Sequence, residues 1–198
     1  VTSDAIKKAA AECIEQATSG KTVSEADGSE AELYESAPCG ENATAELYED
    51  GTLYIKGTGA MEDEEFEYDI QKQWASMIPP WYTEYSTEIA VVKAVIADGI
   101  THIGDCAFVD CTALKEVSIP ESVTTIGGAA FSGCGALESI EIPSSVTEIK
   151  AYAFDSCNNL TEVNIPDGVT TIGEAAFQYC FSMESITIPE SVTEIGAD

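Results

Sequence analysis

The residues of this sequence that could carry chemistry are one histidine, seven cysteines and a large excess of carboxylates. His102 and Cys106 lie four residues apart and have the residue types of a nucleophilic dyad. A working dyad also needs an oxyanion-stabilising group and a residue that orients the histidine, and no motif for either accompanies it. We therefore expect that the protein is not an enzyme and that His102 faces solvent.

Four of the cysteines are spaced 23 residues apart. Zinc sites use closely spaced Cys or His pairs, which this spacing does not supply in sequence, so no metal and no cofactor are expected. The regular spacing predicts one core position of a repeated unit, filled by buried free thiols that pack as small hydrophobic groups. Disulfides between neighbouring thiols of this column are the alternative. The four are Cys111, Cys134, Cys157 and Cys180.

The charge of the chain excludes whole classes of partner. Eight Lys and no Arg stand against 36 Asp plus Glu, which gives a formal net charge of −28. Nucleic acids and anionic bilayers both attract clustered Lys and Arg, so neither is an expected partner. The densest acidic run, 62–69, lacks the glycine and the alternate spacing of a calcium-binding loop. We interpret this run as a solvated loop, although calcium binding there stays open.

These residues belong to a pattern that returns every 23 residues from Ile96 to the C-terminus. In each unit an L-x-x-I-x-I segment alternates with period two, which predicts a short strand with one buried face. One unit alone buries about eight apolar side chains, too few to offset the entropy of ordering it, so neighbouring units must stack. We expect a column of stacked rings at Phe108, Phe131, Phe154 and Phe177, and almost no helix. The expected strands are 116–119, 139–142, 162–165 and 185–188.

The consensus L-x-x-I-x-IP-x-x-V-x-x-IG-x-x-AF-x-x-C closely resembles the BspA-like leucine-rich repeat family of bacterial secreted and cell-surface proteins. The resemblance covers Ile96 to Asp198, and the segment CGENATAELYEDGTLYIKGTGAM resembles the leader that introduces such repeats. It implies a leucine-rich repeat solenoid with 23-residue coils and parallel β ladders. It also implies adhesion or ligand binding outside the cell.

The N-terminal part is expected to be an α+β capping region. Residues 3–18 carry apolar side chains at helical spacing, and the Ser, Glu, Gly and Asp-rich residues 19–36 are typical of a flexible link. Alternating runs around Asp50-Gly51 predict a β-hairpin over 43–57, which either caps the first coil or forms a separate binding domain. The expected divisions are 1–35 (helix and linker), 36–95 (hairpin and aromatic cap) and 96–198 (solenoid).

The aromatic window, the two cysteines outside the repeats and the end of the last coil each allow more than one interpretation. The aromatic window 74–85 either plugs the first coil, which we favour, or stacks against sugar rings. Cys13 and Cys39 lie outside the repeats and could pair. No run of 18 apolar residues occurs, so no membrane insertion is expected. The last coil stops within a repeat, which indicates that the natural chain continues or that another molecule covers this end.

The expected binding site is the outward face of the strands, where side chains would recur about 4.8 Å apart between rungs. This polar strip has no aromatic ring, which favours a basic protein surface over a flat sugar face. The expected partner is thus an extracellular protein or a polysaccharide, and the alternative is a structural spacer of a larger secreted or anchored protein. The outward residues are Glu116, Ser118, Ser139, Glu141, Glu162, Asn164, Ser185 and Thr187.

Overall fold

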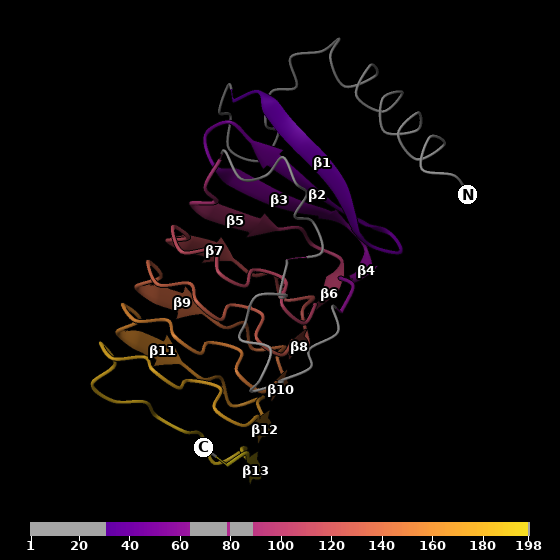
Figure 1. Cartoon of the computed structure of the whole chain (residues 1–198). Helices are drawn as coiled ribbons and strands as arrows, with labels where there is room; N and C mark the ends of the chain where they lie inside the picture. The colour runs from indigo at the N-terminus through magenta and orange to yellow at the C-terminus, as the bar shows by residue number, and fades with distance from the viewer. Residues whose placement is uncertain (1–30, 64–78, 80–88, 198) are drawn as a thin grey trace, which may run out of the picture.

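The computed structural model describes residues 31–63, 79 and 89–197, which form a stack of coils carrying two columns of parallel strands (Figure 1). Within these residues every regular element is a strand, so the expectation of almost no helix in the solenoid is confirmed. The helix expected over 3–18 lies outside the described residues. Of the aromatic window only Pro79 is described, and it is buried. No helix in the described ranges is long and apolar enough to span a bilayer.

The first column of strands is the one predicted from the L-x-x-I-x-I segments. Its members form two parallel pairs with a register of 23 residues, Ala94 with Val117 and Ile140 with Val163, and no backbone pairing joins 116–118 to 139–141. The fourth expected strand, 185–188, is reduced to a single bridge between Asn164 and Thr187. The strands are β5 (Lys93–Ile96), β7 (Glu116–Ser118), β9 (Ser139–Glu141) and β11 (Glu162–Asn164).

A second parallel ladder runs along another side of each coil and forms a six-stranded sheet. It follows the second apolar pair of each repeat, because Val123 and Ile126 turn inward and are fully buried. Pairing again joins residues 23 apart, such as Ile126 with Ile149. The strands are β4 (Gly59–Ala60), β6 (Ile100–Ile103), β8 (Thr125–Ile126), β10 (Glu148–Ile149), β12 (Thr171–Ile172) and β13 (Glu194–Ile195).

The core between the two ladders contains the predicted column of phenylalanines. Neighbouring ring centroids lie 5.1, 5.4 and 5.3 Å apart from Phe108 to Phe177, and the ring planes differ by 6° at most. The first three rings are fully buried, whereas Phe177 is half-buried in the last coil. Burial of such a ring stabilises by about 1.5–3 kcal/mol relative to exposure, so the column is a main source of cohesion between coils.

The ladder cysteines are free thiols, as predicted. The Sγ atoms of Cys134, Cys157 and Cys180 each donate a 3.2 Å hydrogen bond to the phenylalanine carbonyl of the preceding coil, as Cys134 does to Phe108. Cys180, in the last coil, is only half-buried. Cys39 is also a free and buried thiol, which does not support a disulfide to Cys13, a residue outside the described ranges.

The bends of the coils contain left-handed residues that carry a side chain. They lie two positions after the Gly or Lys that follows β6, β8, β10 and β12, at Cys106, Ala129, Tyr152 and Ala175, with φ between 51° and 59°. Left-handed backbone costs a residue with a Cβ about 1–2 kcal/mol. Hydrogen bonds between coils hold these residues there, since the N–H of Ala129 donates to the Ala151 carbonyl at 2.9 Å and the other coils repeat the contact.

The N-terminal segment continues the first ladder. β2 (Ala43–Tyr48) and β3 (Thr52–Gly57) form the predicted hairpin, and β3 pairs in parallel with β5. The hairpin therefore covers the strand edge of the first coil, as a cap requires. A third strand, β1 (Leu33–Gly40), pairs antiparallel with β2. Its start within 19–36 shows that the flexible link was drawn too long.

Candidate functional site: the exposed face of the first ladder

All eight residues predicted to face outward are exposed, and the strand alternation is confirmed for the six of them that lie in β7, β9 and β11. We call these eight residues the ladder face. Parallel pairing sets their register, because Glu162 lies beside Ser139 and Asn164 beside Glu141. Asn164 in turn faces Thr187 across the last bridge. The face is therefore an array of carboxylate, amide and hydroxyl groups, in which backbone pairing fixes the register from Ser139 to Thr187.

Charge along this side of the molecule is graded, which the sequence analysis missed. Lys93 lies beside Glu116 in the ladder, and Lys115 is exposed next to it. Further from the N-terminus, Glu138 and Glu184 are exposed at the slot of Lys115 and add to the carboxylates of the ladder face. The signal was available, since these positions also recur every 23 residues just before each strand. Two lysines thus lie beside the N-terminal end of the ladder face, and carboxylates predominate along the rest of this side.

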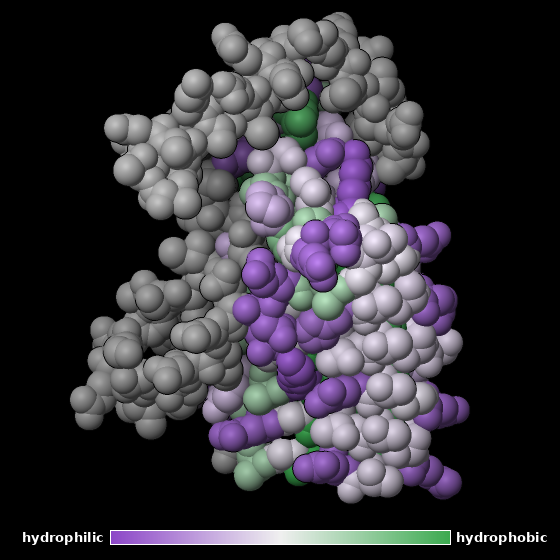
Figure 2. Space-filling view, turned by 90° about the vertical axis from the view of Figure 1, so that its right-hand side faces the viewer, coloured by the Kyte–Doolittle hydropathy of each residue, from purple (hydrophilic) through white to green (hydrophobic). Residues whose placement is uncertain are grey.

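The exposed side of the second ladder is a column of threonines 23 residues apart. Thr124 Oγ1 donates to the Thr101 carbonyl at 3.1 Å, and each later threonine donates likewise to the one before it, at 3.2–3.4 Å. Figure 2 looks onto this side, where hydrophilic residues form stacked rows. Since the hydroxyl protons are already donated within the ladder, these threonines reinforce the stack and offer a ligand only acceptor capacity.

His102 is not the solvent-facing residue that we expected. Its side chain is only 16% exposed, and Nε2 donates to Asp63 Oδ1 at 2.7 Å. The same Asp63 oxygen accepts the Asp105 N–H at 2.8 Å, and Lys150 Nζ lies 3.0 Å from Asp105 Oδ1. Burial tends to raise the pKa of Asp63, but the His102 hydrogen bond, the Asp105 N–H and the nearby Lys150 together lower it. Asp63 is therefore a member of an ion-pair cluster, although its side chain is 49% exposed, and residues 64–69 of the predicted solvated loop lie outside the described residues.

Three ligand atoms of this cluster, from Asp63, His102 and Asp105, lie within 4.8 Å of one another, a spacing that a metal ion could use. Asp105 Oδ1 also accepts the Gly128 N–H at 2.7 Å. The ammonium of Lys150 and the two backbone donors already compensate both carboxylates, and a cation would have to displace them. We therefore assign the cluster a structural role, in which it ties residue 63 to the corner of the first two coils.

The ladder thiols are poor nucleophiles near neutral pH. Burial raises the pKa of Cys111 to about 12, with a smaller contribution from Asp110, and burial raises that of Cys180 to about 11. A thiol acts as nucleophile or metal ligand through its thiolate, which is negligible near neutral pH at such values. Cys106 is completely buried, so the dyad with His102 presents no accessible sulfur.

The comparisons with known proteins agree with this architecture. The model for the BspA type leucine rich repeat region matches residues 84–198 in six copies. No curated protein matches the chain. A leucine-rich repeat protein from Bacteroides ovatus is 37% identical over 53% of this chain and 27% of its own length, with a TM-score of 0.51.

Two further solved structures resemble a larger part of the chain. The leucine-rich repeat protein of T. pallidum is 27% identical over 77% of this chain and 60% of its own, with a TM-score of 0.54. A leucine-rich cell surface protein from Faecalibacterium prausnitzii is 26% identical over 83% of this chain and 50% of its own, with a TM-score of 0.50. The chain therefore spans less than two thirds of each of these neighbours. Because the repeat model matches more than half of the chain and the coils have the expected register, the protein belongs to the BspA-type leucine-rich repeat family.

Proposed function

We propose that this protein is a non-enzymatic binding module at the outside of a bacterial cell and that its ladder face contacts a protein partner. The observation that carries the proposal is the exposed, evenly spaced array on β7, β9 and β11. Backbone pairing holds β9 in register with β11 and β7 in register with β5, while the polar groups of the array face solvent. A preorganised array loses little conformational freedom on binding, which favours its use in recognition. The neighbour described as a cell surface protein supports the location.

The distribution of charge along the ladder face predicts the distribution of charge on the partner's surface. Glu138, Glu141 and Glu162 make the middle of the face acidic, while Lys93 and Lys115 lie at its N-terminal end. A complementary surface has its basic residues opposite β9 and β11 and an acidic group opposite β5. Complementary potentials of this kind act on the association rate and weaken as salt screens them.

The size of the effect follows from the exposure of these groups. A solvent-exposed ion pair contributes about 0.2–1 kcal/mol. Three such pairs together contribute about 0.6–3 kcal/mol, and charge reversal replaces each attraction by a repulsion. We therefore expect the triple substitution Glu116→Lys, Glu141→Lys and Glu162→Lys to weaken binding by at least about 3- to 160-fold.

The experiment compares this triple variant with wild type on a panel of purified extracellular-matrix proteins, with a poly-lysine peptide as the electrostatic standard. The matched control is Asp167→Lys, Glu190→Lys and Glu194→Lys, which makes the same charge change at exposed positions outside the ladder face. Loss of affinity in the ladder-face variant alone supports the proposal. Equal loss in both variants would show that only net charge matters, and unchanged affinity in the ladder-face variant would exclude this site.

The second candidate function is a structural spacer within a longer surface protein. The satisfied threonine column and the continuous ring stack favour it, because both stiffen the solenoid without presenting new donors. If the repeats are a spacer, they bind none of the extracellular-matrix proteins. The binding is then found only in other segments of the longer protein. Binding assays on the repeats and on the full natural protein therefore separate the two functions. The division of the chain at residues 35 and 95 stays a prediction.

A further inference from the structure

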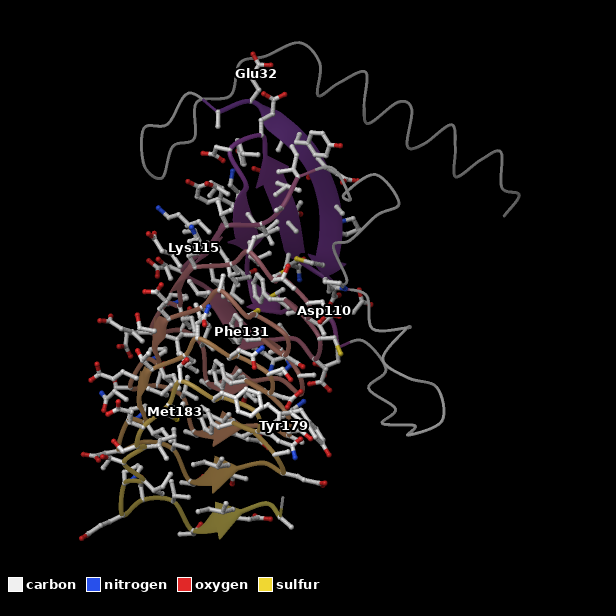
Figure 3. The ribbon with its side chains drawn as sticks, turned by 60° about the vertical axis from the view of Figure 1, so that its left-hand side comes forward. Glu32, Asp110, Lys115, Phe131, Tyr179 and Met183 are labelled. Atoms are coloured by element: carbon white, nitrogen blue, oxygen red, sulfur yellow. The ribbon has the colours of Figure 1, made fainter. Side chains whose placement is uncertain are left out.

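Two aromatic side chains lie exposed in the last complete coil, away from the ladder face. Tyr179 is 54% and Phe181 78% exposed, and their ring centroids lie 5.8 Å apart at an angle of 46°. Figure 3 marks Tyr179 near the C-terminal end of the stack, while Phe131 lies inside it. We call residues 179–182, together with residues 156–159 of the preceding coil, the aromatic turn.

The slots of these rings lie at the surface in the other coils too. Phe181 occupies the slot of Thr112, Gly135 and Asn158, of which Thr112 and Asn158 are exposed and Gly135 is half-buried. Tyr179 occupies the slot of Asp110, Gly133 and Ser156, of which Asp110 is exposed and the other two are half-buried. The side chain between the two rings, Cys180, points inward and donates to the Phe154 carbonyl. The two rings are thus outward residues on either side of an inward anchor.

The backbone holds this surface in place before any ligand arrives. The Phe181 N–H donates to the Tyr179 carbonyl at 2.9 Å, which closes the turn. The Ser182 N–H donates to the Asn158 carbonyl at 3.2 Å and the Ser156 N–H to the Gln178 carbonyl at 2.8 Å, which fasten it to the preceding coil. Rings fixed in this way lose little freedom on binding.

The surface around the rings is polar, and the charges that border it are the buried Asp155, which accepts a hydrogen bond from Ser156 Oγ at 3.1 Å, and the exposed Glu184. Asn158 and Asn159 are exposed one rung above Phe181 and Ser182, and the next turn carries Gly133 and Gly135 in the corresponding slots. Segments 130–137, 156–161 and 178–183 contain no Asp, Glu, Lys or Arg, in a chain whose net charge is −28. The aromatic turn thus presents two aromatic rings and two side-chain amides, next to a turn in which Gly133 and Gly135 leave the backbone uncovered by side chains.

We propose that the aromatic turn binds a short stretch of neutral polysaccharide. The face of an aromatic ring carries partial negative charge and attracts the polarised C–H groups of a sugar ring. The amides of Asn158 and Asn159 both donate and accept hydrogen bonds, as sugar hydroxyls require. Nucleobases also stack on aromatic rings, but nucleic-acid sites combine such rings with a positively charged groove that binds the phosphates. The aromatic turn has no Lys or Arg to form such a groove.

The surface area of the aromatic turn favours a glycan over a protein as its ligand. Three rungs at about 4.8 Å and roughly three residues across at about 3.3 Å give a patch of on the order of 150 Å². A stable protein interface buries about 800 Å² on each partner. The uncharged patch is far too small for such an interface, whereas a few sugar rings can cover it.

The test is native affinity electrophoresis of the whole chain in gels that contain β-glucan, xylan, α-mannan or galactan, with polygalacturonate as the anionic comparison. We expect retardation by at least one neutral polysaccharide, insensitive to salt, and none by polygalacturonate. The double variant Tyr179→Ser and Phe181→Asn uses the residues of the preceding coil, where Ser156 has φ 59°, close to the 55° of Tyr179. It should fold normally and bind about tenfold more weakly or worse.

The control variant is Ile195→Thr, which removes another exposed apolar side chain, 62% exposed, outside the aromatic turn. Ile195→Thr should bind polysaccharide as wild type does. The triple variant of the ladder face should also keep polysaccharide binding, because its substitutions lie outside the aromatic turn. A failure of the ladder-face proposal would therefore leave the aromatic-turn proposal untouched. Lack of retardation by all four neutral polysaccharides, equal loss in Ile195→Thr, or undiminished binding by the double variant would each overturn the proposal. So would capture of a matrix protein that depends on Tyr179 and Phe181.

Discussion

Substitution of Phe154 by alanine tests the core column most directly. Phe154 is fully buried and stacks on Phe131 at 5.4 Å and on Phe177 at 5.3 Å. Replacement of a buried Phe by Ala costs about 3–5 kcal/mol, which includes the cavity that remains. Stacking contributes about 0.5–1.5 kcal/mol for each ring pair within that total. We expect the free energy of unfolding to fall by about 3–5 kcal/mol.

Two comparison variants give the expected rank order. Phe177→Ala should cost roughly half as much as Phe154→Ala, because this ring is half-buried and stacks on one neighbour. Glu141→Ala should change stability by less than about 0.5 kcal/mol, since Glu141 is exposed on the ladder face.

The assay is thermal and denaturant unfolding followed by circular dichroism. For a chain of this size 1 kcal/mol shifts Tm by about 2–4 °C, so Phe154→Ala should lower it by about 6–20 °C. Because stability in a solenoid comes from contacts between neighbours, hydrogen exchange should show the coils around residue 154 opening first. A Phe154→Ala variant that melts at or above Glu141→Ala would refute our assignment of inward and outward positions.

The remaining predictions concern the thiols, the ion-pair cluster and the two surfaces. Ellman titration of native protein should label Cys180 first among the ladder cysteines, because it alone is half-buried, and denaturant should expose all four; fast labelling of Cys134 in native protein would contradict its buried position. The raised thiol pKa values mean that the unfolded chain releases protons first, so stability should fall above about pH 9, by up to about 1.4 kcal/mol per pH unit for each buried thiol; Cys111→Ala should flatten this decline. The lowered pKa of Asp63 contributes stability above its unfolded value and loses it on acidification, so the Tm difference between wild type and Asp63→Asn should shrink below about pH 4; a difference independent of pH would argue against the ion-pair role. Charge reversal on the ladder face should reduce affinity for a matrix protein, and the Tyr179→Ser, Phe181→Asn variant should lose polysaccharide binding, each independently of the other.

Much of the solenoid could be predicted because a repeated sequence states the same constraint several times. Each L-x-x-I-x-I segment identifies one inward and one outward set of side chains, and a shift of one residue would expose the whole apolar set. The positions of Phe131, Cys134 and Ile140 in the core, and of Glu116 and Glu141 outside it, therefore followed from alternation. The Asp50-Gly51 hairpin followed from local turn chemistry in the same way.

Features without repetition or a strong local signal were decided by the tertiary structure. β1 has weak strand chemistry, with Pro38 near its end, and forms because β2 offers it a free edge. Asp63 and His102 lie 39 residues apart, and only the folding of the chain back onto the first coil brings them together. Sequence spacing could not show this contact.

The bends and the surfaces were decided in the same way. Residues with a Cβ at Ala129 and Tyr152 gave no sign of left-handed backbone, since glycine is the usual signal, and the hydrogen bonds between stacked coils impose it. The position of each outward side chain within its coil was determined by the sequence itself. Which of these side chains lie beside each other, such as Asn158 above Phe181, depends on the stacking of coils, because contacts between rungs join residues 23 positions apart.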